Sequence, residues 1–398
     1  MAGGAPPRLR LLALPLAALT QAPDERVLGR RVAARFARRL SAAGVPAAVE
    51  LASLEAGDAR GWVVPDRAET DAELAEAGAR RGAELVLGGA VGLDEAGTKA
   101  ALTVRLVEVE SARRVLERAV ADVDGETWLQ AARDVLTELF ERFGVGRGGR
   151  APLVERGVDL AGFVAQARAE DLDAGRALGH PAADEELLAA WSAAARASPA
   201  SRDTRQMLIG LALDLGLASG AEPAVRTAAR AALEEAAALD PQDPKPLLAA
   251  GEIALAQEDA AAAGALALRV LARDPGHGFA HALAGRAAAF LGQEEAARRH
   301  FLRHVLAAPA EERRRAELAV ARWWLAAGRL ETAHALFAEL NGVEPLEVGG
   351  LLGLAESLLA LDRRPESARA AGIVAVLAEE GTEEQRRARA LLEFIATR

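Results

Sequence analysis

The chain has 398 residues, of which 51% are hydrophobic and 4% aromatic, and its formal net charge is −10 at pH 7. This length allows two or three domains. The sequence contains no Cys, which excludes disulfides, thiolate metal sites and a thiol nucleophile. An acidic chain is a poor general binder of phosphate backbones, and no apolar run reaches ~18 residues. We therefore expect neither a nucleic-acid partner nor a transmembrane segment.

The first apolar run extends from Leu11 to Leu19 and follows Arg8 and Arg10. A short signal peptide and a buried first strand both have this pattern. The run is short and Pro15 interrupts it, which favours a strand over residues 8–16. We therefore expect a cytoplasmic protein, with the periplasm as the alternative if residues 1–22 act as a signal peptide.

A helix is predicted from Asp24, which can cap it, to near Gly44. One face of this helix is apolar. The opposite face carries five arginines, which are Arg30, Arg31, Arg35, Arg38 and Arg39. Such a face suits anionic lipid or RNA, but the commoner arrangement is the solvated outer face of a helix that covers a sheet. We expect the solvated face.

The next part of the chain alternates strands and helices. Strands are predicted over 45–51, 84–91, 99–109 and 113–123, the middle two joined by a hairpin turn at 94–97, and helices over 70–81 and 125–143. Elements in this order give an α+β domain of two layers. We assign residues 1–143 to it.

This domain resembles the TolB amino-terminal-like domain, which many bacterial proteins place ahead of helical repeats. The similarity lies in the opening segment Leu12 to Pro15, in the Gly82 to Val91 strand with its Gly88-Gly89 pair, and in the alternating strand Leu102 to Val109. The chain departs from the pattern at Leu16, where the family usually has Phe, and before Glu117, where it lacks the usual Trp. The resemblance implies protein contacts within an envelope or signalling assembly, and it transfers no catalytic residue.

A Gly-rich segment follows at Gly144 to Gly149, and we predict a linker over 144–152. Beyond it, residues 153–398 are expected to be helical throughout. The central feature is a 34-residue spacing that separates Gly251 from Gly285, and Ala263 from Ala297. A period of 34 residues is typical of tetratricopeptide repeats (TPR), in which each unit is a helix–turn–helix.

The repeat register predicts successive helix pairs. Gly251 and Gly285 are expected where a first helix approaches the second one, opposite Ala263 and Ala297. Before the regular repeats, single helices are predicted over 153–179, 184–197, 204–217 and 223–239. Two regular units occupy 244–277 and 278–311, and two further pairs are predicted over 314–340 and 346–379. The helix over 383–397 is the expected polar cap of a right-handed α-solenoid.

Three other patterns resemble sites. Gly92 to Lys99 has the spacing of a phosphate loop, but Thr98 and Lys99 are inverted and a strand follows, so a plain hairpin turn is favoured. His281, His300 and His304 fall in one repeat, where packing or surface roles are favoured over a metal site. Trp323 and Trp324 resemble a ligand-stacking pair, but Trp324 is expected in the core between helices.

The repeat register also predicts a partner-binding groove on the concave side, lined by the first helix of each pair. The candidate residues are Lys245, Glu252, Phe279, Arg286, Arg315 and Arg322. Three arginines beside an exposed ring suit an acidic segment or a C-terminal carboxylate. In the alternative interpretation these arginines pair with neighbouring glutamates.

These patterns favour a non-enzymatic scaffold or adaptor that binds a peptide or partner domain through the concave face of the solenoid. We expect no catalytic residues, no cofactor and no metal. The alternative is a regulatory or sensory protein whose N-terminal domain binds a small molecule. A large polar pocket with convergent charged groups in residues 8–144 would favour that alternative.

Overall fold

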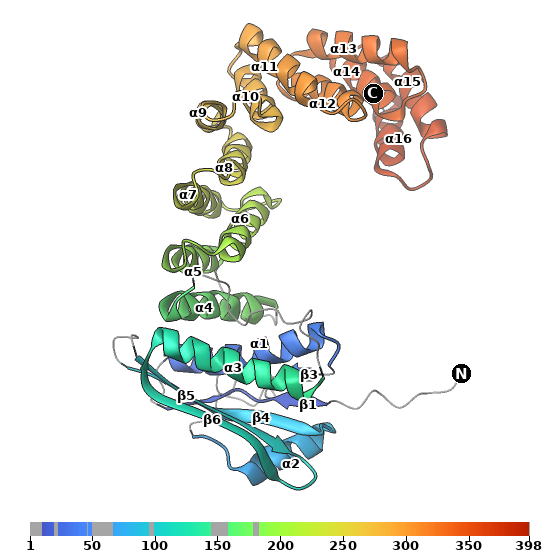
Figure 1. The fold of residues 1–398 in the computed structure, drawn as a ribbon. Coiled ribbons are helices and arrows are strands. Elements are labelled where there is room, and N and C mark those ends of the chain that lie inside the picture. The colour runs from blue at the N-terminus through green and yellow to red at the C-terminus, as the bar shows by residue number, and fades with distance from the viewer. Residues whose placement is uncertain are drawn as a thin grey trace, which may run out of the picture. The chain divides into compact units, whose positions relative to one another are not determined.

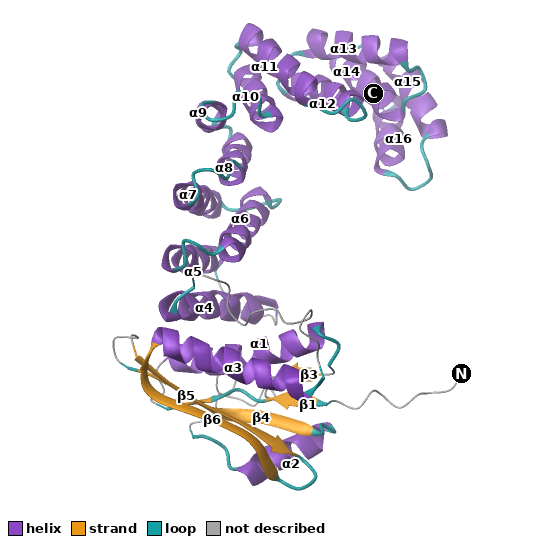
Figure 2. Cartoon of the chain, in the orientation of Figure 1, coloured by secondary structure: helices purple, strands orange, loops and turns teal. Residues whose placement is uncertain are grey.

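The structure is a computed structural model that describes residues 10–19, 23–45, 47–49, 67–94, 99–144, 158–177 and 183–397. It divides into two compact units. The first comprises 1–215 with 238–240, and the second 216–237 with 241–398. Figure 1 labels the elements and Figure 2 separates helices from strands.

The first unit is built on one mixed sheet. Its strands are β1 (Leu11–Ala13), β2 (Ala17–Ala18), β3 (Ala47–Val49), β4 (Leu85–Leu93), β5 (Lys99–Glu108) and β6 (Arg113–Asp124). The order is β3-β1-β4-β5-β6, and β2 also pairs with β4. The pairs that involve β1, β2 and β3 are parallel, whereas β4, β5 and β6 form an antiparallel meander. The strand predicted over residues 8–16 is thus shorter, at Leu11–Ala13, and β2 is a further short strand beyond its predicted end.

Helices cover both faces of this sheet. α1 (Pro23–Ala42) and α3 (Gly125–Arg142) pack on one face, and α2 (Asp71–Arg81) covers part of the other (Figure 1). Successive residues of β4 point to opposite faces. Leu85 and Leu87 therefore join the core with α1 and α3, whereas Val86 packs with α2. The predicted two layers are present, and α2 adds cover on the second face.

Two glycines allow this close packing. A Cβ on Gly88 would lie 2.4 Å from Leu74 Cδ2 of α2. Gly89 has φ 145°, and a Cβ there would lie 2.0 Å from the Thr103 carbonyl oxygen. Residues other than glycine rarely adopt such a φ, because their Cβ clashes with the backbone. The Gly pair therefore allows α2 and β5 to lie close to β4.

The arginine face of α1 is only partly solvated. The prediction of a solvated face is wrong for Arg30 and Arg31, which are buried, whereas Arg38 is exposed. α4 (Leu160–Ala177) packs against it. Arg30 donates from Nε and Nη2 to the Asp171 carboxylate, at 3.1 and 2.7 Å. The two side chains are 5% and 2% exposed. The buried part of this face is thus tolerated because a carboxylate 141 residues away neutralises it.

α4 also extends the core of the sheet domain. Leu160, Phe163 and Val164 join the cluster that contains α1 and α3, and the rings of Phe163 and Trp128 lie 5.8 Å apart. The described part of the helix begins at Leu160, later than predicted, and Asp159 accepts a hydrogen bond from the Gly162 N–H at 2.8 Å. The predicted linker, apart from Gly144, lies outside the described residues. The boundary at 144–152 stays a prediction.

The remaining helices of the chain follow as pairs. Those nearest the sheet domain in sequence are α5 (Asp184–Ala197), α6 (Arg202–Leu217) and α7 (Pro223–Leu239). The regular units are α8 (Lys245–Ala256) with α9 (Ala260–Leu271), and α10 (Gly278–Phe290) with α11 (Glu294–Ala307). After them come α12 (Arg313–Ala326), α13 (Leu330–Val343), α14 (Val348–Ala360), α15 (Arg364–Leu377) and α16 (Glu383–Ala396). The second unit is therefore a TPR-type helical solenoid, as predicted.

The predicted close contacts at the repeat glycines are present, with different partners. A Cβ on Gly251 would lie 2.3 Å from Leu283 Cδ2 of the next repeat, and a Cβ on Gly285 would lie 2.5 Å from the Phe301 ring. The predicted opposing residues are Ala263 and Ala297. The side chains that face the two glycines are instead the larger Leu283 and Phe301. Trp324 is 2% exposed, which confirms its place in the core.

Candidate functional site: the first-helix surface of the solenoid

The first helices of successive units lie side by side, because α8 contacts α10, α10 contacts α12, and α12 contacts α14. Equivalent positions in the repeat register therefore become neighbours across helices. We use the name first-helix surface for the part of α8, α10 and α12 that bears the predicted groove residues. These are Lys245, Glu252, Phe279, Arg286, Arg315 and Arg322.

The best-defined contact on this surface joins two residues of one row. Arg286 Nη1 donates to both oxygens of Glu252, at 2.6 and 2.7 Å. The side chains are 23% and 37% exposed. Arg286 also lies over the Trp323 ring, 5.6 Å from its centroid. The alternative interpretation, in which an arginine pairs with a neighbouring glutamate, therefore applies to Arg286.

Lys245, Arg315 and Arg322 are exposed. The guanidinium of Arg322 lies beside the start of α14, 3.3 Å from the place where a Cβ of Gly349 would stand. Neither Arg315 nor Arg322 forms an ion pair with a carboxylate among the residues that the structure describes. These two side chains remain available to an acidic partner.

A strip of aromatic rings joins the same surface to α11, the helix that carries His304. The Phe279 side chain is 74% exposed, and its ring centroid lies 6.5 Å from that of His304. His304 in turn lies 5.4 Å from Trp323, and Trp323 stacks on Phe301 at 5.5 Å. We call Phe279, His304 and Trp323 the aromatic strip. Phe279 is one of the predicted groove residues, whereas His304 and Trp323 are not.

The histidines of this repeat bind one another and the backbone. His281 Nε2–H donates to the Pro275 carbonyl at 2.9 Å, and the Nδ1 atoms of His281 and His300 lie 3.0 Å apart. His304 Nδ1–H donates to the Gly278 carbonyl at 3.1 Å. Within the described ranges, no group of three His, Cys, Asp or Glu side chains is placed to hold a metal ion. The pairwise contacts agree with the packing role favoured from the sequence.

Burial keeps two of these rings uncharged near neutral pH. The pKa of His300 lies below its usual value, first because of burial and then because of His281, Arg303 and Arg299. Burial also lowers the pKa of His304, against the raising effect of its hydrogen bond to the Gly278 carbonyl. A neutral His304 adds no charge to the aromatic strip.

Together these residues form a surface that can hold an extended segment. An exposed ring and a half-buried Trp offer apolar contacts, and such aromatic groups often contribute most of the energy of an interface. Arg315 and Arg322 offer planar donors for carboxylates. No helix among the described residues has the length and apolar composition required to cross a membrane.

No protein-family model matches the sequence, and no curated protein matches it significantly. Solved structures do show similarity. A thermophilic TPR protein in Thermus thermophilus matches with 18% identity and a TM-score of 0.33, over 48% of this chain and 99% of that one. A tetratricopeptide repeat protein from Parabacteroides merdae matches with 11% identity and a TM-score of 0.39, over 68% of this chain and 93% of that one.

YrrB, described as a TPR protein with an unusual peptide-binding site, matches with 14% identity and a TM-score of 0.33. The match covers 51% of this chain and 97% of YrrB. Scores and identities as low as these carry no argument about function. The assignment of the solenoid therefore rests on the 34-residue spacing and the helix pairs of this chain itself.

Proposed function

We propose that this protein is a non-enzymatic interaction scaffold or adaptor that binds a peptide or partner domain through its first-helix surface. Two observations carry the proposal. The exposed Phe279 continues into His304 and Trp323, and Arg315 and Arg322 are exposed on α12, the helix that carries Trp323. An exposed aromatic group beside cations that are available to a partner is a common feature of surfaces that recognise peptides.

The chemistry of the surface favours an acidic partner segment or a C-terminal carboxylate. Arg binds carboxylates with two parallel hydrogen bonds, and the protein as a whole carries a net charge of −10. A local group of cations on an acidic protein attracts anionic segments at this place more than elsewhere. The envelope or signalling setting implied by the TolB-like resemblance, and a cytoplasmic or periplasmic location, belong to the same proposal.

The test measures the binding of fluorescent acidic peptides to the full-length chain by anisotropy, with a free or an amidated C-terminus. Changing both Arg315 and Arg322 to Glu should weaken binding at least about tenfold, which is about 1.4 kcal/mol. The matched control changes the exposed Arg386 and Arg389 of α16 to Glu, with the same change in net charge. Equal affinity of the parent and the Arg315/Arg322 variant, at unchanged melting temperature, would refute the proposal.

Arg286 requires a different design because it already pairs with Glu252. Arg286→Glu alone would place two carboxylates together and would destabilise the helix pair as well as alter the surface. The exchange Glu252→Arg with Arg286→Glu keeps the ion pair and reverses its direction. If this exchange leaves both peptide affinity and melting unchanged, the pair supports the surface without contacting the partner.

A further inference from the structure

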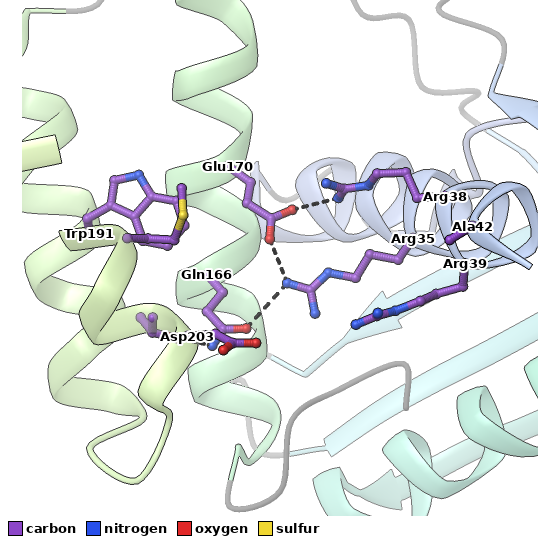
Figure 3. Close-up of a pocket in the computed structure, with 10 residues that line it drawn as sticks. Arg35, Arg38, Arg39, Ala42, Gln166, Glu170, Trp191 and Asp203 are labelled. Carbon is purple, nitrogen blue, oxygen red and sulfur yellow. Dashed lines mark hydrogen bonds and ion pairs between the residues drawn. The ribbon is translucent and has the colours of Figure 1, made fainter. Parts of the chain in front are cut away.

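A cavity of about 550 Å³ lies within the first unit, where α1, α4, α5 and α6 meet. Three arginines of α1 line it, which are Arg35, Arg38 and Arg39, opposite Gln166 and Glu170 of α4 (Figure 3). We call this cavity the arginine pocket. It lies in the other unit from the first-helix surface.

One carboxylate serves two of the three arginines. Arg35 Nη2 lies 2.8 Å from Glu170 Oε1, and Arg38 Nη2 lies 3.0 Å from Glu170 Oε2 (Figure 3). Arg39 lines the same cavity and makes no hydrogen bond or ion pair with any residue that the structure describes. Asp203 is the other carboxylate of the lining, so three guanidiniums and two carboxylates leave an excess of one positive charge.

Docking of α4 on α1 does not explain Arg39. The buried pair of Arg30 and Asp171 already joins the two helices, and Glu170 adds Arg35 and Arg38. The pKa of Arg35 lies below its usual value, first because of burial, and Arg38 and Arg39 lower it further against the raising effect of Glu170. A third guanidinium in this place therefore adds repulsion that a bound anion would relieve.

The rest of the lining divides into a polar and an apolar part. Gln166 and Thr204 are 7% and 2% exposed. The Gln166 amide donates to Thr204 Oγ1, and its carbonyl oxygen accepts from Arg35 Nη2 at 3.3 Å. Trp191 is 4% exposed and Met207 49%. A molecule with a charged end and an apolar body matches this division better than a bare ion does.

We propose that the arginine pocket binds a small organic anion, a molecule that carries one phosphate or carboxylate group on an apolar or aromatic body. Arg39 is the main charge partner of the oxyanion, and Arg38 is the second donor. Guanidinium groups bind both kinds of oxyanion in a planar, two-bonded arrangement. Trp191 and Met207 contact the body of the ligand. The proposal is independent of partner binding by the solenoid.

The test titrates the full-length chain by calorimetry with phenyl phosphate and phenylacetate, which share a ring and differ in the oxyanion. Benzyl alcohol is the uncharged match, and inorganic phosphate lacks the body. We expect saturable binding of at least one of the two ring-bearing anions, and the tighter of them identifies the preferred oxyanion. Benzyl alcohol and inorganic phosphate should bind at least about tenfold more weakly, about 1.4 kcal/mol.

Two variants locate the binding in the arginine pocket. Arg39→Gln removes the charge from a side chain that has no partner to lose among the described residues, and Ala42→Phe fills the cavity without changing its charge. Both should weaken binding of the preferred anion about tenfold or more, whereas Arg142→Gln, an exposed position on α3, should not. No saturable binding of either ring-bearing anion, equal binding of inorganic phosphate, or full binding by both pocket variants would each overturn the proposal.

Discussion

Close packing at single residues determines how tightly the solenoid units stack. Gly285 faces the ring of Phe301 so closely that a Cβ would stand 2.5 Å from two of its ring atoms. Phe301 cannot turn aside freely, because Trp323 stacks on it and Trp324 meets its edge at 5.3 Å. Even one methyl group is therefore too large for this place.

Gly285→Ala should lower the free energy of unfolding by ~1–3 kcal/mol, the usual cost of overpacking a core. Gly372→Ala is the matched control, because it is a helical glycine with no atom within 4 Å of the added Cβ. The control should be neutral or more stable by up to ~1 kcal/mol, since Ala favours helix. Chemical denaturation measures both values. A Gly285→Ala variant as stable as the control would contradict the packing.

Histidine titration gives a second prediction at this scale. The folded chain holds the pKa values of His300 and His304 below the ordinary value of 6.5. When the pH falls through that value, the unfolded chain binds these protons before the folded chain does, so stability decreases. The stabilisation is complete above the unfolded pKa and is lost between it and the lower folded values.

Thermal melts at pH 7.5, 6.5 and 5.5 would test this dependence. The parent should lose stability across the range, and the double variant His300→Gln with His304→Gln should lose less of it. His277→Gln is a suitable control, because His277 lies in the same repeat and caps α10 from outside this pair. If the double variant follows the parent at every pH, these rings are not the source of the pH dependence.

At the scale of elements, the junction of α1 and α4 depends on one buried carboxylate. Asp171 accepts hydrogen bonds from Arg30 and lies 3.5 Å from a guanidinium nitrogen of Arg31. Both arginines are buried, at 5% and 6% exposed. Burial lowers the pKa of Arg31, and Asp171 and Glu170 oppose that effect. These buried arginines and their carboxylate partners are therefore stable only while all of them are present.

Asp171→Asn should therefore destabilise the protein by roughly 3–5 kcal/mol, because it leaves two guanidiniums buried without their carboxylate. Asp173→Asn, an exposed position on the same helix, is the control and should change stability by no more than about 0.5 kcal/mol. Differential scanning calorimetry of the full chain measures both. Equal melting of the two variants would mean that water reaches this junction.

Helix pairs could be predicted because their signals are local. Pro223 and Leu239 bound α7 as expected, since Pro suits the first helical turn. The turns also repeat: Gly292 and Gly328 have φ values of 73° and 72°, and the equivalent Glu258 and Asp362 adopt 63° and 59°. Neither carboxylate residue signals a left-handed turn by itself, and only the register identifies these positions.

The junction and the pocket could not be predicted from local pattern. Arg30 and Asp171 are separated by 141 residues, and no periodicity relates them. The five arginines of α1 have the pattern of a solvent-facing stripe, because the sequence of one helix does not show which other helix packs against it. The same limit hid the arginine pocket, which combines side chains of α1, α4, α5 and α6. His304 joined the aromatic strip for the same reason, since its partner rings lie on other helices.

At the scale of the whole molecule, the sheet domain and the solenoid differ in how their parts depend on one another. One face of the sheet gathers residues from β1 to α4 into a single cluster, and the same strands also carry the cluster under α2, so the strands and helices of this domain should unfold together. The solenoid is assembled from neighbours: α15 packs on α14, and α16 packs on α14 and α15. The free energy of unfolding of such an array is close to a sum of contributions from each repeat and from its contacts with the adjacent repeats.

Because each helix packs only on its neighbours, the helices should differ in how fast their backbone amides exchange with solvent. α16 buries only Gln385 and Ala388 among its described residues, so it can detach while the interior repeats stay closed. Deuterium should consequently enter α16 first, then α15, and reach α10 with its nine buried residues much later. The end of the solenoid would behave as a fraying edge, and shortening the array from that end should remove protection gradually instead of in one step.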